Sequence, residues 1–279
     1  MSYKTILVHA DLSSHAPERI KIAAALAVAE GAHLIGAAMT GISSAIYHGD
    51  TVDLSGSVIA GRIAALQDDA RRALAQFEAL AQACGVSSYE ARQLNDDPQG
   101  GLALQARYAD LVVVSQTDLD EPLSRIIPDL PEYVVLNCAR PVLVVPYAGE
   151  SGLPWPRVLL AWDGSIGATR AVTNAIPLLR RAQNVAVALF NPSQQHGAHG
   201  EQPGADIALF LARHGVTVEV LPQRTDIDVG NALLSLVADQ RSDLIVMGGY
   251  GHTRFRELLL GGVTKTILRT MTAPVLMSH

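Results

Sequence analysis

The sequence predicts an α/β protein built as two tandem doubly wound domains, each a five-stranded parallel sheet with helices on both faces. Three observations lead to this fold class: short apolar runs alternate with helical patterns, several runs are continuously apolar, and the chain repeats itself. A continuously apolar strand such as Leu111-Val112-Val113-Val114 is typical of a parallel sheet that helices cover on both sides. Ligands of such sheets bind beyond the carboxyl ends of the strands, where the strand order reverses.

The internal repeat is visible in three pairs of segments. The first pair consists of apolar strands that end on an aspartate, Asp11 in one half and Asp163 in the other. The other two pairs share an offset of 133 residues, so Ser115 aligns with Gly248 and Pro141 with Pro274. Two copies of one domain are the simplest explanation of such a repeat. The predicted domains are residues 1–147 and 155–279, and residues 41–60 are extra chain in the first.

The expected elements follow one another in the same order in both halves. In the first half we expect strands near residues 4–9, 33–39, 87–94, 111–115 and 142–146, and helices near 16–30, 60–83, 98–108 and 130–138. In the second half we expect strands near residues 157–162, 184–190, 216–222, 243–248 and 274–278, and helices near 166–181, 203–214, 228–240 and 262–270. This alternation of strand and helix favours parallel sheets.

Charge, apolar run length and cysteine content exclude several kinds of partner and location. The net charge is -6 and there is no long basic block, so we expect neither a nucleic acid nor a membrane surface as a partner. No apolar run approaches the length of a membrane-spanning helix, and the first residues do not read as a secretion signal. Cys84 and Cys138 are far apart, which favours buried core thiols in a reducing cytoplasm.

One glycine-rich segment follows an apolar strand and precedes a predicted helix in the second half. It reads Gly248-Gly249-Tyr250-Gly251, then nine residues, then Gly261-Gly262-Val263-Thr264. Glycines at a strand end let the backbone approach a ligand closely, and free N–H groups at a helix N-terminus attract anions. The segment is therefore a candidate phosphate-binding loop.

Together these residues carry a family resemblance. Asp163-Gly164-Ser165 after the first strand resembles the start of a universal stress protein domain. The spacing of Gly248, Gly251 and Gly261 resembles that family's nucleotide loop, and Ala273-Pro274-Val275-Leu276 resembles its last strand. The resemblance covers essentially the whole chain and implies a Rossmann-like, adenine nucleotide alpha hydrolase-like fold. It also implies a stress-response protein that binds ATP or another adenine nucleotide, with or without Mg²⁺.

The resemblance assigns roles to residues on both sides of the predicted site. Asp163, beside Gly164 and Ser165, would face the adenosine through its ribose hydroxyls. Gly248, Gly251 and Gly261 would let backbone N–H groups wrap the phosphates. A plain alternative for Asp163 is that it caps the helix that follows it.

The second part of the loop departs from the family pattern. Gly262 stands where the family has Ser or Thr, so one hydroxyl donor is missing, at a cost of roughly 0.5–1.5 kcal/mol. Val263 would supply a backbone N–H and Thr264 a hydroxyl. His252 and Arg254 lie where a cation could pair with a phosphate, or they are solvated loop residues. A metal site at His196 and His199 has no third ligand in evidence.

The first half is altered at the same positions. Ser115, Asp118, Pro128 and Asp129 stand opposite Gly248, Gly251, Gly261 and Gly262. Carboxylates repel phosphates, and proline removes a backbone donor. We therefore expect one nucleotide per chain, in the second half. Because the first half keeps the scaffold without these glycines, the sequence also suggests that the fold does not require them.

Three functions remain open. The first is a nucleotide-dependent sensor or regulator with a protein partner, and the second is a slow ATPase, for which Asp163 is the only evident Mg²⁺ carboxylate. The third is a scaffold that binds no nucleotide. In dimers of single-domain relatives the last strands meet edge to edge, so the two halves are expected to form an internal pseudo-dimer, with a homodimer of the chain also open.

Overall fold

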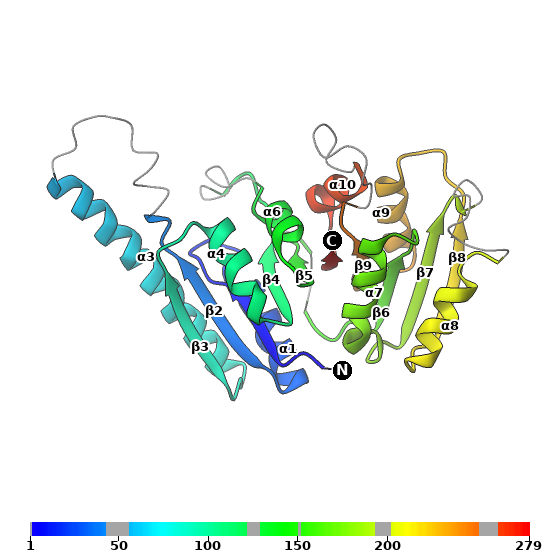
Figure 1. Cartoon of the computed structure of the whole chain (residues 1–279), viewed down its shortest axis with the longest axis horizontal. Helices are drawn as coiled ribbons and strands as arrows, with labels where there is room; N and C mark the ends of the chain where they lie inside the picture. The colour runs from blue at the N-terminus through cyan, green and yellow to red at the C-terminus, as the bar shows by residue number, and fades with distance from the viewer. Residues whose placement is uncertain (1, 43–55, 122–128, 150–151, 193–201, 251–261) are drawn as a thin grey trace. The chain divides into compact units, whose positions relative to one another are not determined.

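The computed structural model describes residues 2–42, 56–121, 129–149, 152–192, 202–250 and 262–279 (Figure 1). The described chain divides into two compact units, Tyr3–Arg140 and Pro141–His279. Each is an α/β unit built around a mostly parallel sheet, which confirms the predicted fold class. We refer to them as the first and the second unit.

The first unit contains four parallel strands in the order β3-β2-β1-β4. They are β1 (Thr5–His9), β2 (His33–Met39), β3 (Tyr89–Leu94) and β4 (Leu111–Ser115). The central strands β1 and β4 are apolar and buried because helices cover both faces of the sheet, as the continuous apolar runs predicted. The chain runs outward from β1 to β2 and β3 and then returns to β4, so the strand order reverses between β1 and β4.

Two pairs of helices flank this sheet. They are α1 (Ala16–Glu30) with α3 (Gly56–Ala83), and α4 (Pro98–Gln105), continued by the 3₁₀ turn η1 (Ala106–Tyr108), with α6 (Leu130–Asn137). Asp97 begins α4 as its N-cap, and Pro98 occupies the first turn, where a missing N–H costs nothing. Helix α3 begins inside the extra segment 41–60, of which residues 43–55 lie outside the described structure.

The second unit contains six strands in the order β5-β10-β9-β6-β7-β8. They are β5 (Val142–Val145), β6 (Arg157–Ala161), β7 (Asn184–Phe190), β8 (Val218–Gln223), β9 (Leu244–Gly248) and β10 (Val275–Ser278). Neighbours are parallel except β5 and β10, where Leu143 lies opposite Leu276 in an antiparallel pair. The expected edge-to-edge contact of the last strands is therefore found. Because β5 pairs with β10, it belongs to the second compact unit, which begins at Pro141.

The helices of the second unit are α7 (Ile166–Leu179), α8 (Ala205–Arg213), α9 (Val229–Asp239) and α10 (Gly262–Thr270). Helix α7 packs on β9 and β10, α8 packs on β8, and α9 packs on α10 (Figure 1). Ser165 caps α7 and Asp228 caps α9, each by accepting a backbone N–H with its side chain. The strand order reverses between β6 and β9, so the carboxyl ends of these strands mark the edge where a ligand is expected.

Two further expectations have a direct outcome. Among the described helices, none is long and apolar enough to cross a membrane. Cys138 is buried as expected, but Cys84 is exposed, because it follows the last turn of α3. The expectation of a buried thiol was therefore wrong for Cys84, and both cysteines are free thiols.

Candidate functional site

The strand reversal of the second unit brings two predicted site segments together. Asp163 follows β6, and Gly248 ends β9, and these strands are parallel neighbours with Ala161 opposite Met247. The structure thus places Asp163 and the start of the glycine segment at the same end of the sheet. This is the position at which doubly wound sheets bind ligands.

The conformation after β6 leaves the carboxylate of Asp163 exposed. Oδ1 of Asp163 accepts the backbone N–H of Ser165 at 3.0 Å, and Gly164 between them has a φ of 71°, a left-handed conformation that favours glycine. The hydroxyl of Ser165, not the carboxylate of Asp163, caps α7 by accepting the N–H of Ala168 at 3.1 Å. Asp163 is therefore not the helix cap, which removes the plain alternative for this residue.

Gly248 has a packing role that the sequence did not reveal. A Cβ atom placed on Gly248 would lie 2.5 Å from the backbone nitrogen of Ala168 and 2.8 Å from the carbonyl carbon of Gly167. Helix α7 therefore begins against the bare backbone of β9. The inference that the fold does not require these glycines was wrong for Gly248, because a side chain there would collide with the backbone of α7.

Residues after β9 are fixed to the first turn of α10. The N–H of Tyr250 donates to Oγ1 of Thr264 at 3.2 Å, and Thr264 is only 3% exposed. The N–H of Gly249 donates to the carbonyl of Ser278 at 2.8 Å. Thr264 therefore joins the strand end to the helix.

The remaining predicted residues divide into two groups. Gly262 is exposed and Val263 half-buried at the start of α10, with their N–H groups in the first turn, where no intrahelical acceptor exists. Gly251, His252, Arg254 and Gly261 lie outside the described residues, as do His196 and His199.

Sequence reasoning missed Asp228. Its Oδ1 caps α9 by accepting the N–H of Asn231 at 3.1 Å, and its Oδ2 lies 4.0 Å from the position that a Cβ of Gly262 would occupy. A cap before α9 could have been read from the sequence. Its closeness to α10 depends on how two helices pack, which no local pattern encodes.

In the first unit the matching aspartate, Asp11, is held internally by Arg19. The guanidinium of Arg19 is nearly fully buried and donates to Oδ1 of Asp11 at 2.9 Å, to the carbonyl of His9 at 2.8 Å and to Oγ of Ser115 at 2.7 Å. Ser13 also donates to Oδ1 of Asp11 from its N–H and hydroxyl, at 3.0 and 2.6 Å. The corresponding positions in the second half are Ala171 for Arg19, Ala161 for His9 and Gly248 for Ser115.

This cluster fixes the charges of its members. Burial alone would raise the pKa of Asp11, but the charge of Arg19 and the hydrogen bonds from Ser13 and Arg19 outweigh it and hold that pKa well below its usual range. Burial lowers the pKa of His9 to about 4. At neutral pH, His9 is therefore uncharged, and its Nδ1, 3.3 Å from Oδ2 of Asp11, makes no ion pair.

Residues after β4 also form hydrogen bonds with residues that follow β1. Nε2 of His15 lies 2.8 Å from Oδ2 of Asp118, and the N–H of Ser14 donates to Oε1 of Glu121 at 2.9 Å. The hydrogen bond with His15 lowers the pKa of Asp118. Asp118 stands where the second half has Gly251. In the first unit, the carboxylates of Asp118 and Glu121 therefore bind the His15 ring and the Ser14 N–H, which an anionic ligand would otherwise use.

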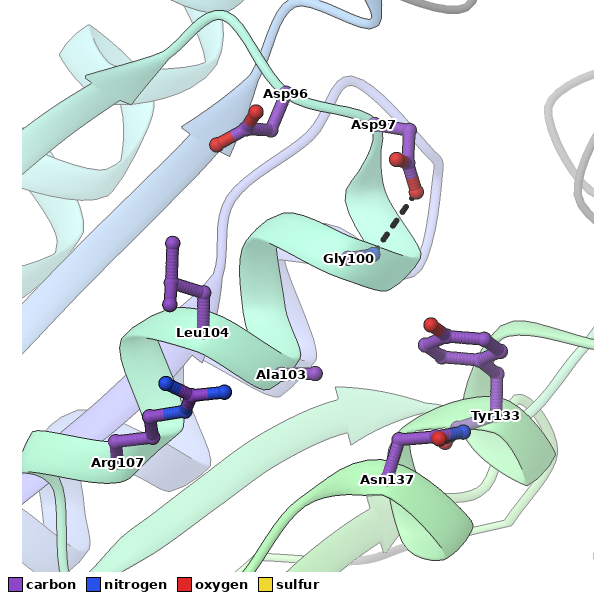
Figure 2. Close-up of a pocket in the computed structure, with 8 residues that line it drawn as sticks. All are labelled: Asp96, Asp97, Gly100, Ala103, Leu104, Arg107, Tyr133 and Asn137. Atoms are coloured by element: carbon purple, nitrogen blue, oxygen red, sulfur yellow. Dashed lines mark hydrogen bonds between the residues drawn. The ribbon is translucent and has the colours of Figure 1, made fainter.

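A shallow pocket of about 450 Å³ lies between α4 and α6 of the first unit (Figure 2). It is lined by Asp96, Asp97, Gly100, Ala103, Leu104, Arg107, Tyr133 and Asn137. Figure 2 shows Asp97 turned back to cap α4 through the N–H of Gly100, at 2.9 Å. Asp97 is the counterpart of Asp228 in the second unit. Its two acidic residues make this pocket a poor place for a phosphate.

The residues of this site could help to bind Mg²⁺ only when the ion is also bound by the phosphates of a nucleotide. Within the described ranges, no group of three or more His, Cys, Asp or Glu side chains could hold a metal ion. Mg²⁺ is commonly bound by one or two carboxylates together with substrate phosphates. Asp163 and Asp228 are two described carboxylates at this end of the second unit that could take that part.

Comparison with known proteins agrees with the class that the fold and site define, an α/β protein with a ligand edge at a strand reversal. The sequence model of the universal stress protein family matches residues 2–146 and 154–279. The chain belongs to this family and carries two copies of its domain.

Individual relatives are distant. Universal stress protein Slr1230 of Synechocystis sp. is 27% identical over 147 residues, which are 52% of this chain and 49% of that protein, so the match spans about half the length of the relative. The crystal structure of a universal stress protein from Archaeoglobus fulgidus covers 98% of this chain and 94% of its own, at 15% identity and a TM-score of 0.76, which shows the shared fold. A universal stress protein in complex with cAMP covers 52% of this chain and 98% of its own, at 24% identity and a TM-score of 0.38.

Proposed function

We propose that the second unit binds ATP or a related adenine nucleotide and that the chain acts as a nucleotide-dependent sensor or regulator. The observation that carries this proposal is the contrast between the two matching aspartates. Asp11 is committed to Arg19, whereas Asp163 is exposed and has no ion-pair partner among the described residues. An exposed carboxylate at a strand reversal is suited to accept hydrogen bonds from ribose hydroxyls.

The phosphates would lie toward α10. The backbone leaves β9 through Gly248 and Gly249, and α10 begins with Gly262 and Val263, whose N–H groups have no intrahelical acceptor. Such a helix start attracts anionic groups. Gly251, Arg254 and Gly261 complete the proposed loop on the strength of the family resemblance.

Binding is favoured over rapid catalysis. Phosphoryl transfer requires charge stabilisation, usually a metal ion, and a positioned nucleophile. The described part of the site offers Asp163 and Asp228 but no group of metal ligands and no base held against a nucleophile.

Cys84 and Cys138 are unpaired thiols, which supports action in a reducing cytoplasm.

Calorimetric titration of the full chain with ATP and Mg²⁺ tests the proposal. We expect one nucleotide per chain, and we expect Asp163→Ala to weaken binding while Asp206→Ala, an exposed aspartate in the first turn of α8, leaves it unchanged. Two equivalent nucleotides per chain, or equal binding by both variants, would contradict the proposal.

The remaining functions are distinguished by two measurements. Mass spectrometry of ligand released from purified protein should detect an adenine nucleotide, whereas a pure scaffold would release none. Phosphate release by the wild-type chain, compared with Gly261→Asp, tests the slow ATPase. Equal rates would mean that the glycine loop does not hydrolyse ATP.

A further inference from the structure

The carboxylate of Asp228 lies beside the first turn of α10. Asp228 comes from the start of α9, and its Oδ2 lies 4.0 Å from the point that a side chain on Gly262 would occupy. Its other oxygen, Oδ1, is engaged by the N–H of Asn231 at 3.1 Å. The capping bond therefore orients the carboxylate and leaves Oδ2 on the side of Gly262.

The position of Asp228 is fixed by the packing of the two helices. A Cβ on Gly230 would lie 2.8 Å from Cβ of Thr266 and 2.9 Å from Oδ1 of Asp228, so α9 approaches α10 where only glycine fits. Gly230 is buried, and the cap holds the first turn of α9 at this contact. The carboxylate is thus a built part of this end of the second unit.

Resting on the proposed function, we propose that Asp228 sets the charge selectivity of the nucleotide site. The negative charge of Asp228 opposes a bare phosphate chain beside Gly262, while a divalent cation bound to that chain removes the opposition. Two unit charges about 4 Å apart interact by about 1 kcal/mol in water, and Asp228 is exposed to water. The preferred ligand is therefore a metal-complexed adenine nucleotide, and the metal-free triphosphate binds more weakly.

The variant Asp228→Asn separates this role from helix capping. Asparagine caps helices about as well as aspartate, so the stability of the second unit should not change. In EDTA, calorimetry should show that Asp228→Asn binds ATP up to about fivefold more tightly than the wild-type chain, since 1 kcal/mol corresponds to about that factor. Affinity for adenosine, which carries no phosphate, should be the same in both proteins.

Addition of Mg²⁺ provides the second readout. Mg²⁺ should strengthen ATP binding by the wild-type chain more than by Asp228→Asn, because the variant has less repulsion to relieve. Asp97→Asn is the matched control: it makes the same change at the corresponding cap in the first unit, and it should alter neither ATP affinity nor its Mg²⁺ dependence.

Each outcome has a definite meaning. If Asp228→Asn binds ATP like the wild-type chain in EDTA, or gains equally for adenosine, the role of Asp228 is refuted and the proposed function survives. If neither the wild-type chain nor the variants bind any of these ligands, both proposals fail. If the variant unfolds at a lower urea concentration and binds all ligands more weakly, Asp228 is only a cap and the inference is wrong.

Discussion

Arg19 donates a 2.9 Å hydrogen bond to the carboxylate of Asp11, and the second half has Ala171 in place of Arg19 beside its own aspartate, Asp163. The same strand end is therefore closed by an internal ion pair in one unit and left exposed in the other. The two halves share a scaffold, and the buried Arg19 is one of the differences between them. This difference underlies the expectation of a single nucleotide site.

Replacing Arg19 with alanine, the residue of the second half, should strongly destabilise the first unit. Asp11 would keep a partly buried carboxylate without its ion-pair partner, and breaking such a pair costs about 3–5 kcal/mol. Urea unfolding of Arg19→Ala, followed through the first unit, measures this loss. Nucleotide binding by the second unit should remain.

Arg72→Ala is the control for this variant. Arg72 is exposed on α3 and pairs with Asp68 and Asp69, an arrangement that contributes less than about 1 kcal/mol. If both variants lost a similar amount of stability, the buried Arg19 cluster would contribute no more to folding than an exposed ion pair.

His9 should make the first unit sensitive to mild acid. Burial lowers the pKa of His9 from 6.5 to about 4, so the folded state binds fewer protons than the unfolded state between these values. Stability should therefore fall as the pH drops through this window, by up to about 3 kcal/mol. At still lower pH, protonation of Asp11, whose pKa is also depressed, should destabilise the first unit further.

Hydrogen exchange of the β1 amides at pH 7 and pH 4.5 would measure this effect. His9→Ala, which copies Ala161 of the second half, should show a flatter dependence on pH than the wild-type chain. Identical dependence in the two proteins would mean that His9 does not contribute.

Most elements of the fold could be predicted from sequence periodicity, because strands such as β4 and β9 are buried on both faces and therefore continuously apolar. The pairing of β5 with β10 could be expected only through the family resemblance, since β5 alone reads as any buried strand. The burial of Arg19 escaped notice because arginine is usually exposed and only its partners reveal its place.

The position of the candidate site, but not its packing, could be predicted from the sequence. Strand ends can be located from sequence, so Asp163 and Gly248 were correctly placed at one edge. The closeness of Asp228 to Gly262 and of Gly248 to Ala168 results from helix packing, which depends on tertiary contacts. Local sequence patterns do not contain that information.

The two cysteines should differ in reactivity. Cys84 is exposed, whereas Cys138 is buried and burial raises the pKa of its thiol to about 12. Because the thiolate is the reactive form, a thiol reagent at pH 7.5 should modify Cys84 and spare Cys138 in the folded chain. Mass spectrometry of the labelled peptides would show this, and denatured protein, in which both should react, is the control.

Two glycines of the loop should respond in opposite ways to a small side chain. Gly248→Ala would force a methyl group against the backbone of α7, where overpacking typically costs 1–3 kcal/mol, so the second unit should be less stable in urea. A variant as stable as the wild-type chain would show that α7 can move aside freely.

Gly262→Ser should instead be tolerated and should strengthen the site. The nearest described atom to an added Cβ is Oδ2 of Asp228 at 4.0 Å, so nothing described obstructs the side chain. The serine would restore the hydroxyl that the family pattern has there, and one hydrogen bond is worth roughly 0.5–1.5 kcal/mol, or up to about tenfold in affinity. Calorimetry with ATP and Mg²⁺ should show this gain, while adenosine binding should not change. A gain for both ligands would place the hydroxyl away from the phosphates, and no gain for ATP would mean that the first turn of α10 does not contact them.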